Sequence, residues 1–449
     1  MPIRPRPTRT KRAADGPGEP WRLFAVAAPG LEPLIHDELR RLGVNGRITA
    51  GGVAFSGGPA PLYAANLHLR TASRILVRLG EFAAAAFHEL ERRSRRIPWE
   101  IAIRPGDAVE VRATSRKSRL YHSDAVAERV LAAIDRRVGG ILPAPSSRAT
   151  ARACPERSEG DRSEPTPVPR VARGGGGSVS VDEGGGATEA QLVVIRIDHD
   201  RVTVSIDSSG ALLHQRGYRL DVARAPLRET LAAALVLAAG WDPRTPLVDP
   251  MCGSGTIAIE AALIARRIAP GLARSFAFER WPNFEASTWR SLRDAARQDI
   301  QPNVPAPILA SDRDDGAVEA TRSNASRAGV LDDLTIDRRP LSAAEPPPMP
   351  IEAREAPRPA GAESPDRPAA AGWLVTNPPY GVRVGDRAPL RDLYARLGQL
   401  ARARFAGWML ALLTAEPALE RQLALDLSVR VRTSNGGIPV RMVVGRIPT

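Results

Sequence analysis

The stretch LVDPMCGSGT, residues 247–256, constrains the fold more than any other part of the chain. It joins an apolar run to an apolar helical segment through a tight turn that contains Gly253 and Gly255. Glycines in such a turn let the backbone approach a ligand closely, and the helix N-terminus that follows favours an anionic group. The spacing is not G-x-G-x-x-G and no lysine follows the glycines, so the turn is neither a dinucleotide fingerprint nor a P-loop. We therefore expect a strand, a ligand-binding turn and a helix here.

Strand-like and helix-like segments alternate from about residue 223 to the C-terminus. This alternation is the signature of an α/β domain with a doubly wound, mostly parallel sheet. The last two strands are joined by NGG, residues 435–437, which is a strong hairpin signal. We expect strands at 246–249, 307–312, 333–337, 373–377 and 407–414, and helices at 225–240, 257–267, 315–329 and 390–405.

Asp312 stands at the end of the second strand expected in this sheet. A carboxylate in that position can accept hydrogen bonds from a ribose diol. The same residue could serve as the N-cap of the next helix, and the sequence leaves both interpretations open. Cys252 is interpreted as a small turn residue and not as a nucleophile, because no histidine lies near it in sequence.

The segment TNPPYG, residues 376–381, follows the apolar run WLV and holds two adjacent prolines. Proline fixes its own φ, lacks an N–H and pushes the preceding residue into an extended conformation. The segment is therefore expected to be a stiff loop that presents the Asn377 amide, backbone carbonyls and the Tyr380 ring. This arrangement offers hydrogen-bond acceptors beside a stacking surface, although a rigid turn with a packed tyrosine would have the same sequence.

The N-terminal half, from Trp21 to about Pro143, mixes short strands with helices and carries two basic clusters. One cluster is ERRSRRIPWE, residues 91–100. The other lies within residues 111–134, where a strand leads through Arg116, Lys117 and Arg119 into a helix that begins near Ser123. Arginines beside a helix N-terminus bind phosphate well, but a solvated helix face and a polar loop would look the same.

Three segments have too little aliphatic content to bury a core. They are the basic, proline-rich residues 1–20 and two inserts, residues 144–189 and 344–372, all of which we expect to be disordered. The chain resumes after the first insert with an expected hairpin, QLVVIRIDHDRVTVSID, so this insert interrupts the N-terminal region and does not end it.

Composition limits the classes of function. The formal net charge of +13 favours a polyanionic partner, although an arginine-rich composition could arise without functional selection. Two distant cysteines and six histidines show no ligand spacing, so we expect no disulfide and no metal site. Apolar stretches such as LAAALVLAA fall short of the roughly 20 residues that span a bilayer, and the N-terminus lacks the apolar core of a secretory signal. A cytoplasmic location is the expectation.

The D-P-x-C-G-S-G-T turn, the acidic residue at the end of the next strand and N-P-P-Y together resemble class I S-adenosylmethionine-dependent methyltransferases that modify exocyclic or amide nitrogens. Three further stretches resemble a narrower family, the THUMP-domain guanine-N2 methyltransferases of large-subunit ribosomal RNA. These stretches are residues 205–236, LRTASRILVRLGEF and IPWE. The resemblance implies an RNA partner and an α+β region, ferredoxin-like plus THUMP, over residues 21–210. It also implies a Rossmann-like methyltransferase domain over 211–449, with a seven-stranded, mostly parallel sheet and a C-terminal antiparallel hairpin.

The resemblance also implies roles for individual residues. S-adenosylmethionine would lie against Asp312 at its ribose and close to Asn377. Asn377 and Pro378 would accept hydrogen bonds from the target amine, and Pro379 and Tyr380 would contact the base. Arg116, Lys117 and Arg119 would contact RNA. The methionine end of the cofactor would lie against the turn, at Asp249, Gly253, Ser254, Gly255 and Thr256.

The chain departs from the family at two positions. RRPLS follows Asp337 where relatives often supply an acid toward the adenine, and Val382 stands where they often have an acidic residue. A transfer RNA target, DNA adenine N6 and a protein glutamine amide remain alternatives for the same loop. A non-catalytic RNA-binding assembly factor is an alternative of a different class.

Overall fold

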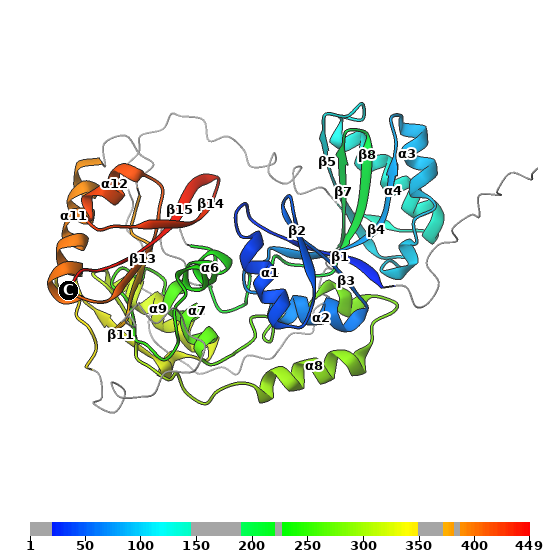
Figure 1. Cartoon of the computed structure of the whole chain (residues 1–449). Helices are drawn as coiled ribbons and strands as arrows, with labels where there is room; N and C mark the ends of the chain where they lie inside the picture. Colours follow the sequence, from blue (N-terminus) through cyan, green and yellow to red (C-terminus); the bar gives the residue numbers. More distant parts are fainter. Residues whose placement is uncertain (1–19, 145–189, 221–226, 349–370, 381–386) are drawn as a thin grey trace, which may run out of the picture. The chain divides into compact units, whose positions relative to one another are not determined.

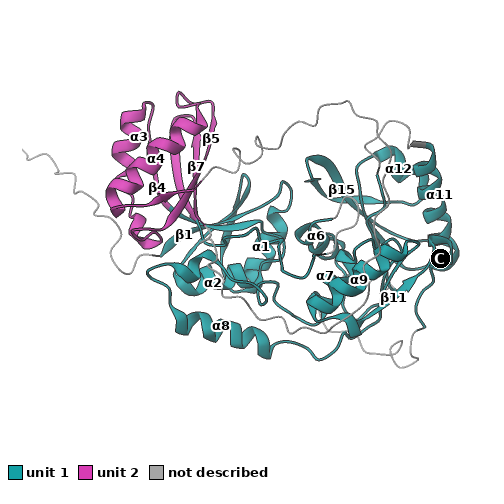
Figure 2. Cartoon of the chain, turned by 180° about the vertical axis from the view of Figure 1, so that it is seen from behind, with its two compact units in different colours: residues 1–78, 207–449 teal, residues 79–206 magenta. Residues whose placement is uncertain are grey.

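The computed structural model describes residues 20–144, 190–220, 227–348, 371–380 and 387–449 (Figure 1). Nearly all of the basic tail and of the two inserts expected to be disordered lies outside the described residues, as does Val382. The described part forms two compact units, residues 1–78 with 207–449 and residues 79–206 (Figure 2). The domain limits expected from the sequence stay predictions.

The larger unit contains a seven-stranded sheet in the order β11-β10-β9-β12-β13-β15-β14. Strands β9 to β13 run parallel and β15 is antiparallel to β13, so the expected fold class is confirmed. Strands β14 and β15 form the hairpin expected around NGG. The strands are β9 (Leu247–Asp249), β10 (Ile308–Asp312), β11 (Leu334–Arg338), β12 (Trp373–Thr376), β13 (Met409–Thr414), β14 (Ser428–Asn435) and β15 (Ile438–Arg446).

Helices cover both faces of this sheet. Successive side chains of a strand point to opposite faces, and because both sets are apolar here, each face packs against helices. Leu247 belongs to a core cluster with α6, α7 and α9, whereas Val248 belongs to a second cluster with α11 and α12 (Figure 1). The first group of helices is α6 (Glu229–Ala239), α7 (Thr256–Ala265) and α9 (Asp315–Ala328). The second is α11 (Arg387–Arg404) and α12 (Pro417–Gln422).

Residues 21–78 add an antiparallel sheet portion to the same unit, with the strand order β2-β3-β1-β4. The apolar side chain of Leu31 from this portion joins the core cluster that also contains α6 and α7, two helices that are apolar nearly all round. The elements are β1 (Trp21–Val26), α1 (Glu32–Arg41), β2 (Gly46–Thr49), β3 (Gly52–Gly57) and α2 (Pro59–His68). Helix α8 (Ala286–Gln298), which the sequence did not suggest, packs against α2.

The smaller unit consists of residues 79–206, and strand β4 (Arg74–Ala83) runs from one unit into the other. Its own strands follow the order β8-β7-β5-β6, with β5 parallel to β7. The expected hairpin is confirmed as β7 and β8, with His199 and Asp200 at positive φ in the turn. The elements are α3 (Phe87–Ser94), β5 (Ala108–Arg116), α4 (Ser123–Val138), β6 (Leu142–Pro143), β7 (Gln191–Asp198) and β8 (Arg201–Asp207).

A buried polar network within the larger unit joins residues near 70 and 216 to helix α7. The fully buried carboxylate of Glu260 accepts hydrogen bonds from Arg216 Nε at 3.1 Å and from the Tyr218 hydroxyl at 3.0 Å. Arg70 lies 3.9 Å from the same carboxylate, and its Nη2 donates to the carbonyls of Leu263 and Ile268. A buried charge is tolerated only when it is paired and hydrogen-bonded, so these segments must assemble together.

We expect Glu260→Ala to lower the free energy of unfolding by about 3 to 5 kcal/mol, because it leaves Arg216 buried without its ion-pair partner. Glu260→Gln should cost less, since its amide oxygen can still accept from Tyr218. Glu319→Ala, at an exposed position of α9, is the matched control and should change the value by less than about 0.5 kcal/mol. Chemical denaturation of the three variants measures the differences, and equal losses for Glu260→Ala and Glu319→Ala would contradict the role of the network.

Candidate functional site

The carboxyl ends of three parallel strands bring the separate sequence motifs together. Strand β9 pairs with β10 on one side and with β12 on the other. The glycine turn after β9, Asp312 at the end of β10 and the loop 376–380 after β12 therefore meet at one edge of the sheet. Ligands bind at this edge in open α/β sheets, where the chain connections diverge to opposite sides.

Asp249 ends β9 as a buried carboxylate with one unsatisfied oxygen. Its Oδ1 accepts from Thr376 Oγ1 at 2.8 Å and from the Met251 amide at 3.3 Å. Its Oδ2 is buried and has no hydrogen-bond partner among the described residues. Burial raises the pKa of Asp249 to about 7, and the nearby charge of Asp312 adds to the rise. Oδ2 is thus available to a ligand.

The two glycines of the turn have different roles, although both have positive φ (55° at Gly253 and 80° at Gly255). A Cβ on Gly255 would lie 2.5 Å from Thr321 Cγ2, so this glycine permits close packing against α9. A Cβ on Gly253 would meet no atom within 4 Å, so the space beside it is open. Gly253 therefore has the property expected of a backbone that a ligand approaches closely.

Helix α9 holds the turn in place with two side chains that sequence reasoning missed. Thr321 Oγ1 donates to the Gly253 carbonyl at 2.9 Å, and Asn324 Nδ2 donates to the Ser254 carbonyl at 3.1 Å. Both side chains are fully buried. Their spacing of three residues, which places them on one face of the helix, was the only available signal.

Asp312 contacts the turn directly. Its Oδ2 accepts from the Gly253 amide at 3.0 Å, and its Oδ1 accepts from the Asp314 amide at 3.1 Å. The interpretation of Asp312 as a helix N-cap is wrong, because Asp314 caps α9 by accepting from the Ala317 amide at 2.9 Å. Asp312 therefore lies at the carboxyl edge as a half-buried acceptor and not as a cap.

The loop after β12 combines a buried free acceptor with a half-buried aromatic ring. Asn377 Oδ1 is buried without a hydrogen-bond partner among the described residues. Pro378 is buried, whereas Pro379 is exposed. The Tyr380 ring packs against both core clusters, and its hydroxyl accepts a hydrogen bond from Asn435 Nδ2 at 2.7 Å. Asn435 belongs to the NGG hairpin, and no local pattern linked it to this loop.

The Cys252 thiol is buried at the start of the turn, 3.6 Å from Thr321 Oγ1. Burial is the main reason that the pKa of this thiol lies far above its usual range, and the charge of Asp249 raises it further. The thiol is accordingly unsuited to act as a nucleophile at neutral pH, as the sequence indicated.

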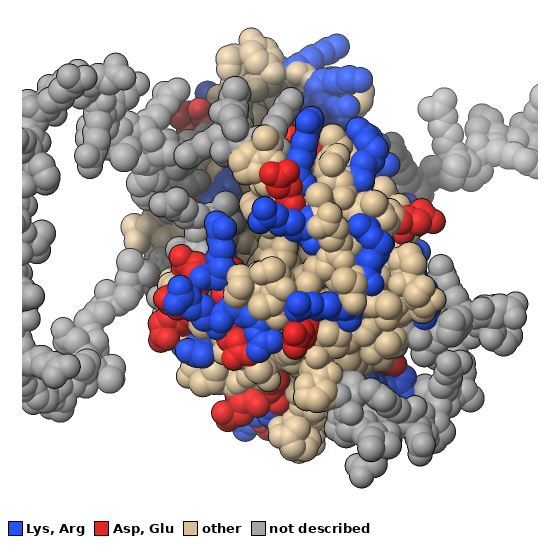
Figure 3. Space-filling model, turned by 90° about the vertical axis from the view of Figure 1, so that its left-hand side faces the viewer, with Lys and Arg blue, Asp and Glu red and all other residues tan. Residues whose placement is uncertain are grey.

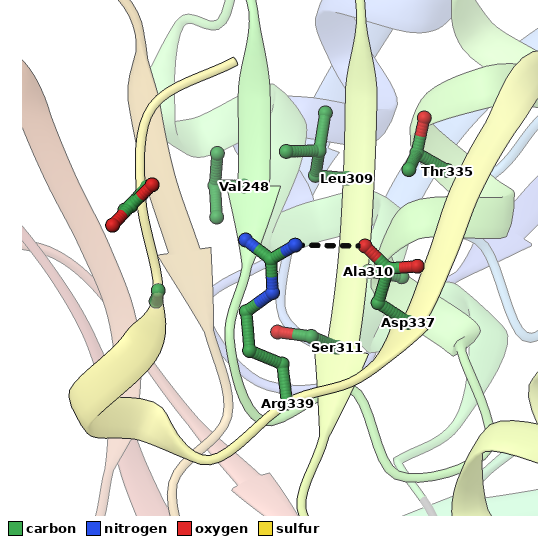
Figure 4. Close-up of a pocket in the computed structure, with 9 residues that line it drawn as sticks. Val248, Leu309, Ala310, Ser311, Thr335, Asp337 and Arg339 are labelled. Carbon is green, nitrogen blue, oxygen red and sulfur yellow. Dashed lines mark hydrogen bonds and ion pairs between the residues drawn. The ribbon is translucent and has the colours of Figure 1, made fainter.

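A shallow hollow adjoins the carboxyl edge of the sheet (Figure 4). Val248 and Leu309 form its apolar floor, and Arg339 crosses it to pair with Asp337 at 3.1 Å. The Arg339 amide donates to the Asp312 carbonyl at 2.8 Å, which places the hollow next to the candidate site. Two acidic side chains, Asp337 and Glu345, also line the hollow.

The basic residues expected to contact RNA lie in the smaller unit. Arg116, Lys117 and Arg119 are exposed at the end of β5 and in the loop before α4. The Arg119 amide donates to Asp200 Oδ1 at 2.7 Å, which fixes this loop to the β7–β8 turn. Tyr121, 70% exposed and with its ring tilted against that of His122, lies in the same loop and was missed by sequence reasoning.

The other basic cluster, residues 91–100, contains acidic side chains that form ion pairs with arginines of the same unit. Arg95 and Arg136 both donate to Glu91 Oε1 at 2.5 Å, and Arg137 pairs with Glu100. Acidic side chains also interrupt the basic ones on the face of the larger unit that includes α11 (Figure 3). In the loop around Lys117, Arg119 Nε lies 3.8 Å from Asp200 Oδ2, while Arg116, Lys117 and Tyr121 are exposed.

The described residues contain no group of three or more histidine, cysteine, aspartate or glutamate side chains that could hold a metal ion. Among the same residues, no helix has the length and apolar character needed to cross a membrane.

Two family models match the chain. Residues 216–343 and 364–443 match the RMKL-like methyltransferase domain, and residues 22–76 match the RlmL ferredoxin-like domain. The second match covers most of the antiparallel portion formed by β1, α1, β2, β3 and α2.

Similar proteins of known sequence or structure support these matches. The ribosomal RNA large subunit methyltransferase K/L of Syntrophotalea carbinolica is 33% identical over 94% of this chain, but the chain spans only 53% of that relative. A putative RNA methyltransferase of Synechocystis is 31% identical, with 94% of this chain and 95% of the relative covered. The crystal structure of a putative methyltransferase complexed with SAH has a TM-score of 0.75 at 27% identity, covering 96% of this chain and 99% of that chain.

The raised pKa of Asp249 predicts a pH dependence of stability in the ligand-free protein. In the folded state Asp249 holds a proton that it releases near pH 4 in the unfolded state. The stabilisation of the folded state by this proton is fully present below about pH 4 and is lost as the pH rises through about 7. Asp249→Asn cannot titrate, yet its amide oxygen can still accept from Thr376. We therefore expect the stability of the variant relative to the wild type to increase from pH 5 to pH 8, by at most about 1.4 kcal/mol per pH unit.

Chemical denaturation at several pH values measures this difference. Asp426→Asn, at an exposed aspartate, is the matched control and should follow the wild type. Parallel curves for the wild type and Asp249→Asn would contradict the assignment.

Proposed function

This chain belongs to the RMKL-like methyltransferase family, and we propose that it transfers a methyl group to the exocyclic N2 amine of a guanine in large-subunit ribosomal RNA. The observation that carries the proposal is the buried Asn377 Oδ1, which has no partner among the described residues and lies at the edge where the glycine turn and Asp312 meet. A buried acceptor without a partner costs free energy, and a substrate N–H would relieve that cost.

S-adenosylmethionine is the cofactor, in keeping with the family and with the SAH held by the similar crystal structure. The residues of the turn fit such a ligand, because a Cβ at Gly253 would enter open space and Asp249 Oδ2 is unsatisfied. When bound, the sulfonium supplies an activated methyl group. Asp249 and residues 253–256 would hold the methionine end, and the Asp312 carboxylate would face the ribose.

The loop 377–380 would make the target nitrogen a better nucleophile. The N2 lone pair of guanine is delocalised into the ring, so the amine reacts poorly while it stays planar. Asn377 Oδ1 and the Pro378 carbonyl would accept its N–H bonds and favour a more tetrahedral nitrogen. Because the prolines fix these acceptors before the substrate arrives, little reorganisation is needed, and most of the rate follows from orientation and proximity.

Tyr380 would stack on the target base. Its ring is only half-buried and lies two residues after Pro378, and its hydroxyl is already hydrogen-bonded to Asn435. Enzymes that modify bases bind them extruded from the helix or in single strands, stacked on aromatic side chains. A guanine on this ring would place its edge near Asn377.

RNA as the substrate is supported by the names of the relatives and by the basic loop of the smaller unit. The chain spans about half the length of the K/L relatives, so the ribosomal target is carried over as a proposal. Exposed Arg116, Lys117 and Arg119 would contact phosphates, and exposed Tyr121 would stack on an unpaired base. Mapping methylated guanines in RNA from a strain that lacks the protein identifies the target nucleotide. The same map decides between ribosomal RNA and transfer RNA as the substrate.

We expect Asn377→Ala to lower the turnover number on the order of a hundredfold or more, because it removes a fixed acceptor that matters most as the amine becomes tetrahedral. Asn377→Asp keeps an acceptor in place and should retain more activity. S-adenosylmethionine affinity should change little in both variants, since the turn and Asp312 provide most of the cofactor contacts. Single-turnover methyl transfer and calorimetry separate the two effects. Near-normal turnover of the alanine variant would mean that the loop is only a rigid turn.

Charge reversal of Arg116, Lys117 and Arg119 to glutamate should weaken RNA binding and make it less sensitive to salt. Each lost phosphate contact reduces the slope of log affinity against log salt by about one, so a reduction of up to about three is expected. Reversal of Arg92, Arg93, Arg95 and Arg96 is the matched comparison and should have a smaller effect, because Arg95 is already paired with Glu91. Equal affinity and slope in the wild type and the first variant would exclude the basic loop as an RNA contact.

A further inference from the structure

The β14–β15 hairpin extends past the carboxyl edge of the sheet. Thr414, the last residue of β13, pairs with Arg441 of β15. Residues 438–440 of β15 lie beyond this pair, and at about 3.3 Å per residue they carry the tip roughly 10 Å past the end of β13. Because β13 is the neighbour of β12, the tip reaches the level of the loop that follows β12.

The tip makes a direct contact with that loop. Asn435 ends β14, and its Nδ2 donates to the Tyr380 hydroxyl at 2.7 Å across 55 residues of sequence. The side chain of Asn435 and the ring of Tyr380 are both half-buried, so water competes for this hydrogen bond less than it would at an open surface.

Neighbouring contacts fix the position of the tip. Gly436 and Gly437 have φ of 57° and 86°, values that favour glycine in a tight hairpin turn. Val431 belongs to the core cluster under α6. A Cβ on Gly30 would lie 2.1 Å from the Arg432 carbonyl, so the turn before α1 packs closely on the backbone of β14. Asn435 is thus presented by a braced strand and not by a loose loop.

We propose that Asn435 is a positioning residue of the substrate site, which fixes the Tyr380 ring in the orientation that stacks on the target base. This inference rests on the proposed function. A tyrosine ring can rotate about its two side-chain torsions, and stacking requires one orientation of the ring plane. The hydrogen bond anchors the hydroxyl end of the half-buried ring.

The anchoring predicts effects on the RNA substrate and not on the cofactor. Asn435→Ala should lower kcat/KM for RNA roughly 3- to 10-fold, the range expected for the loss of one intramolecular hydrogen bond. Tyr380→Phe should have a similar effect, since it keeps the ring and removes the same bond. The double variant should be no worse than either single variant, because both substitutions break one interaction. Asn435→Asp should rescue activity, since its carboxylate can accept from the tyrosine hydroxyl.

The experiment measures kcat and KM with unmodified 23S ribosomal RNA transcribed in vitro, together with SAH affinity and the melting temperature. Ser434→Ala, one residue earlier in the hairpin, is the matched control and should keep the wild-type kcat/KM. SAH affinity should be unchanged in every variant.

The outcomes separate the inference from the function on which it rests. A wild-type protein that transfers no methyl group to RNA would overturn both. An active wild type with an equally active Asn435→Ala variant, or with additive losses in the double variant, would overturn the positioning role alone. Equal losses in Ser434→Ala and Asn435→Ala would show a general loosening of the hairpin and would also overturn it.

Discussion

The carboxylate of Glu260 on α7 is fully buried, and its hydrogen-bond and ion-pair partners come from two distant parts of the chain. Arg216 and Tyr218 approach from the segment before the methyltransferase sheet, and Arg70 approaches from the end of the N-terminal portion. Helix α7 begins at the glycine turn, so the network that anchors the helix also fixes the element on which the candidate cofactor site is built.

The candidate site combines rigid backbone with a few unsatisfied oxygens. Thr321 and Asn324 hold the carbonyls of the turn, and Asp312 accepts from its Gly253 amide. Asp249 Oδ2 and Asn377 Oδ1 remain buried without partners among the described residues. Most buried polar atoms in folded proteins are hydrogen-bonded, and we propose that ligand groups satisfy these two oxygens.

Local sequence patterns predicted the methyltransferase sheet well, from the strand and helix limits to the NGG hairpin. They failed where partners come from afar. Asp312 was open to interpretation as a helix cap, but it accepts from the Gly253 amide, 59 residues away in sequence, and Asp314 caps the helix. Asn435 was read only as a turn residue, although it bonds to Tyr380. Helix α8 was not anticipated, although it is amphipathic and buries Trp289 and Ala296 on one face.

The sequence by itself determined which chemistry is available: a glycine turn before a helix, an acid after the next strand and an amide followed by two prolines. These features depend on backbone stereochemistry and short-range periodicity, which a few adjacent residues specify. The tertiary structure alone decided which oxygens stay unsatisfied and which side chains brace the site. Burial and hydrogen bonding are properties of neighbours in space, and at this edge the neighbours come from β9, β10 with α9, β12 and β14, which are separated by long stretches of chain.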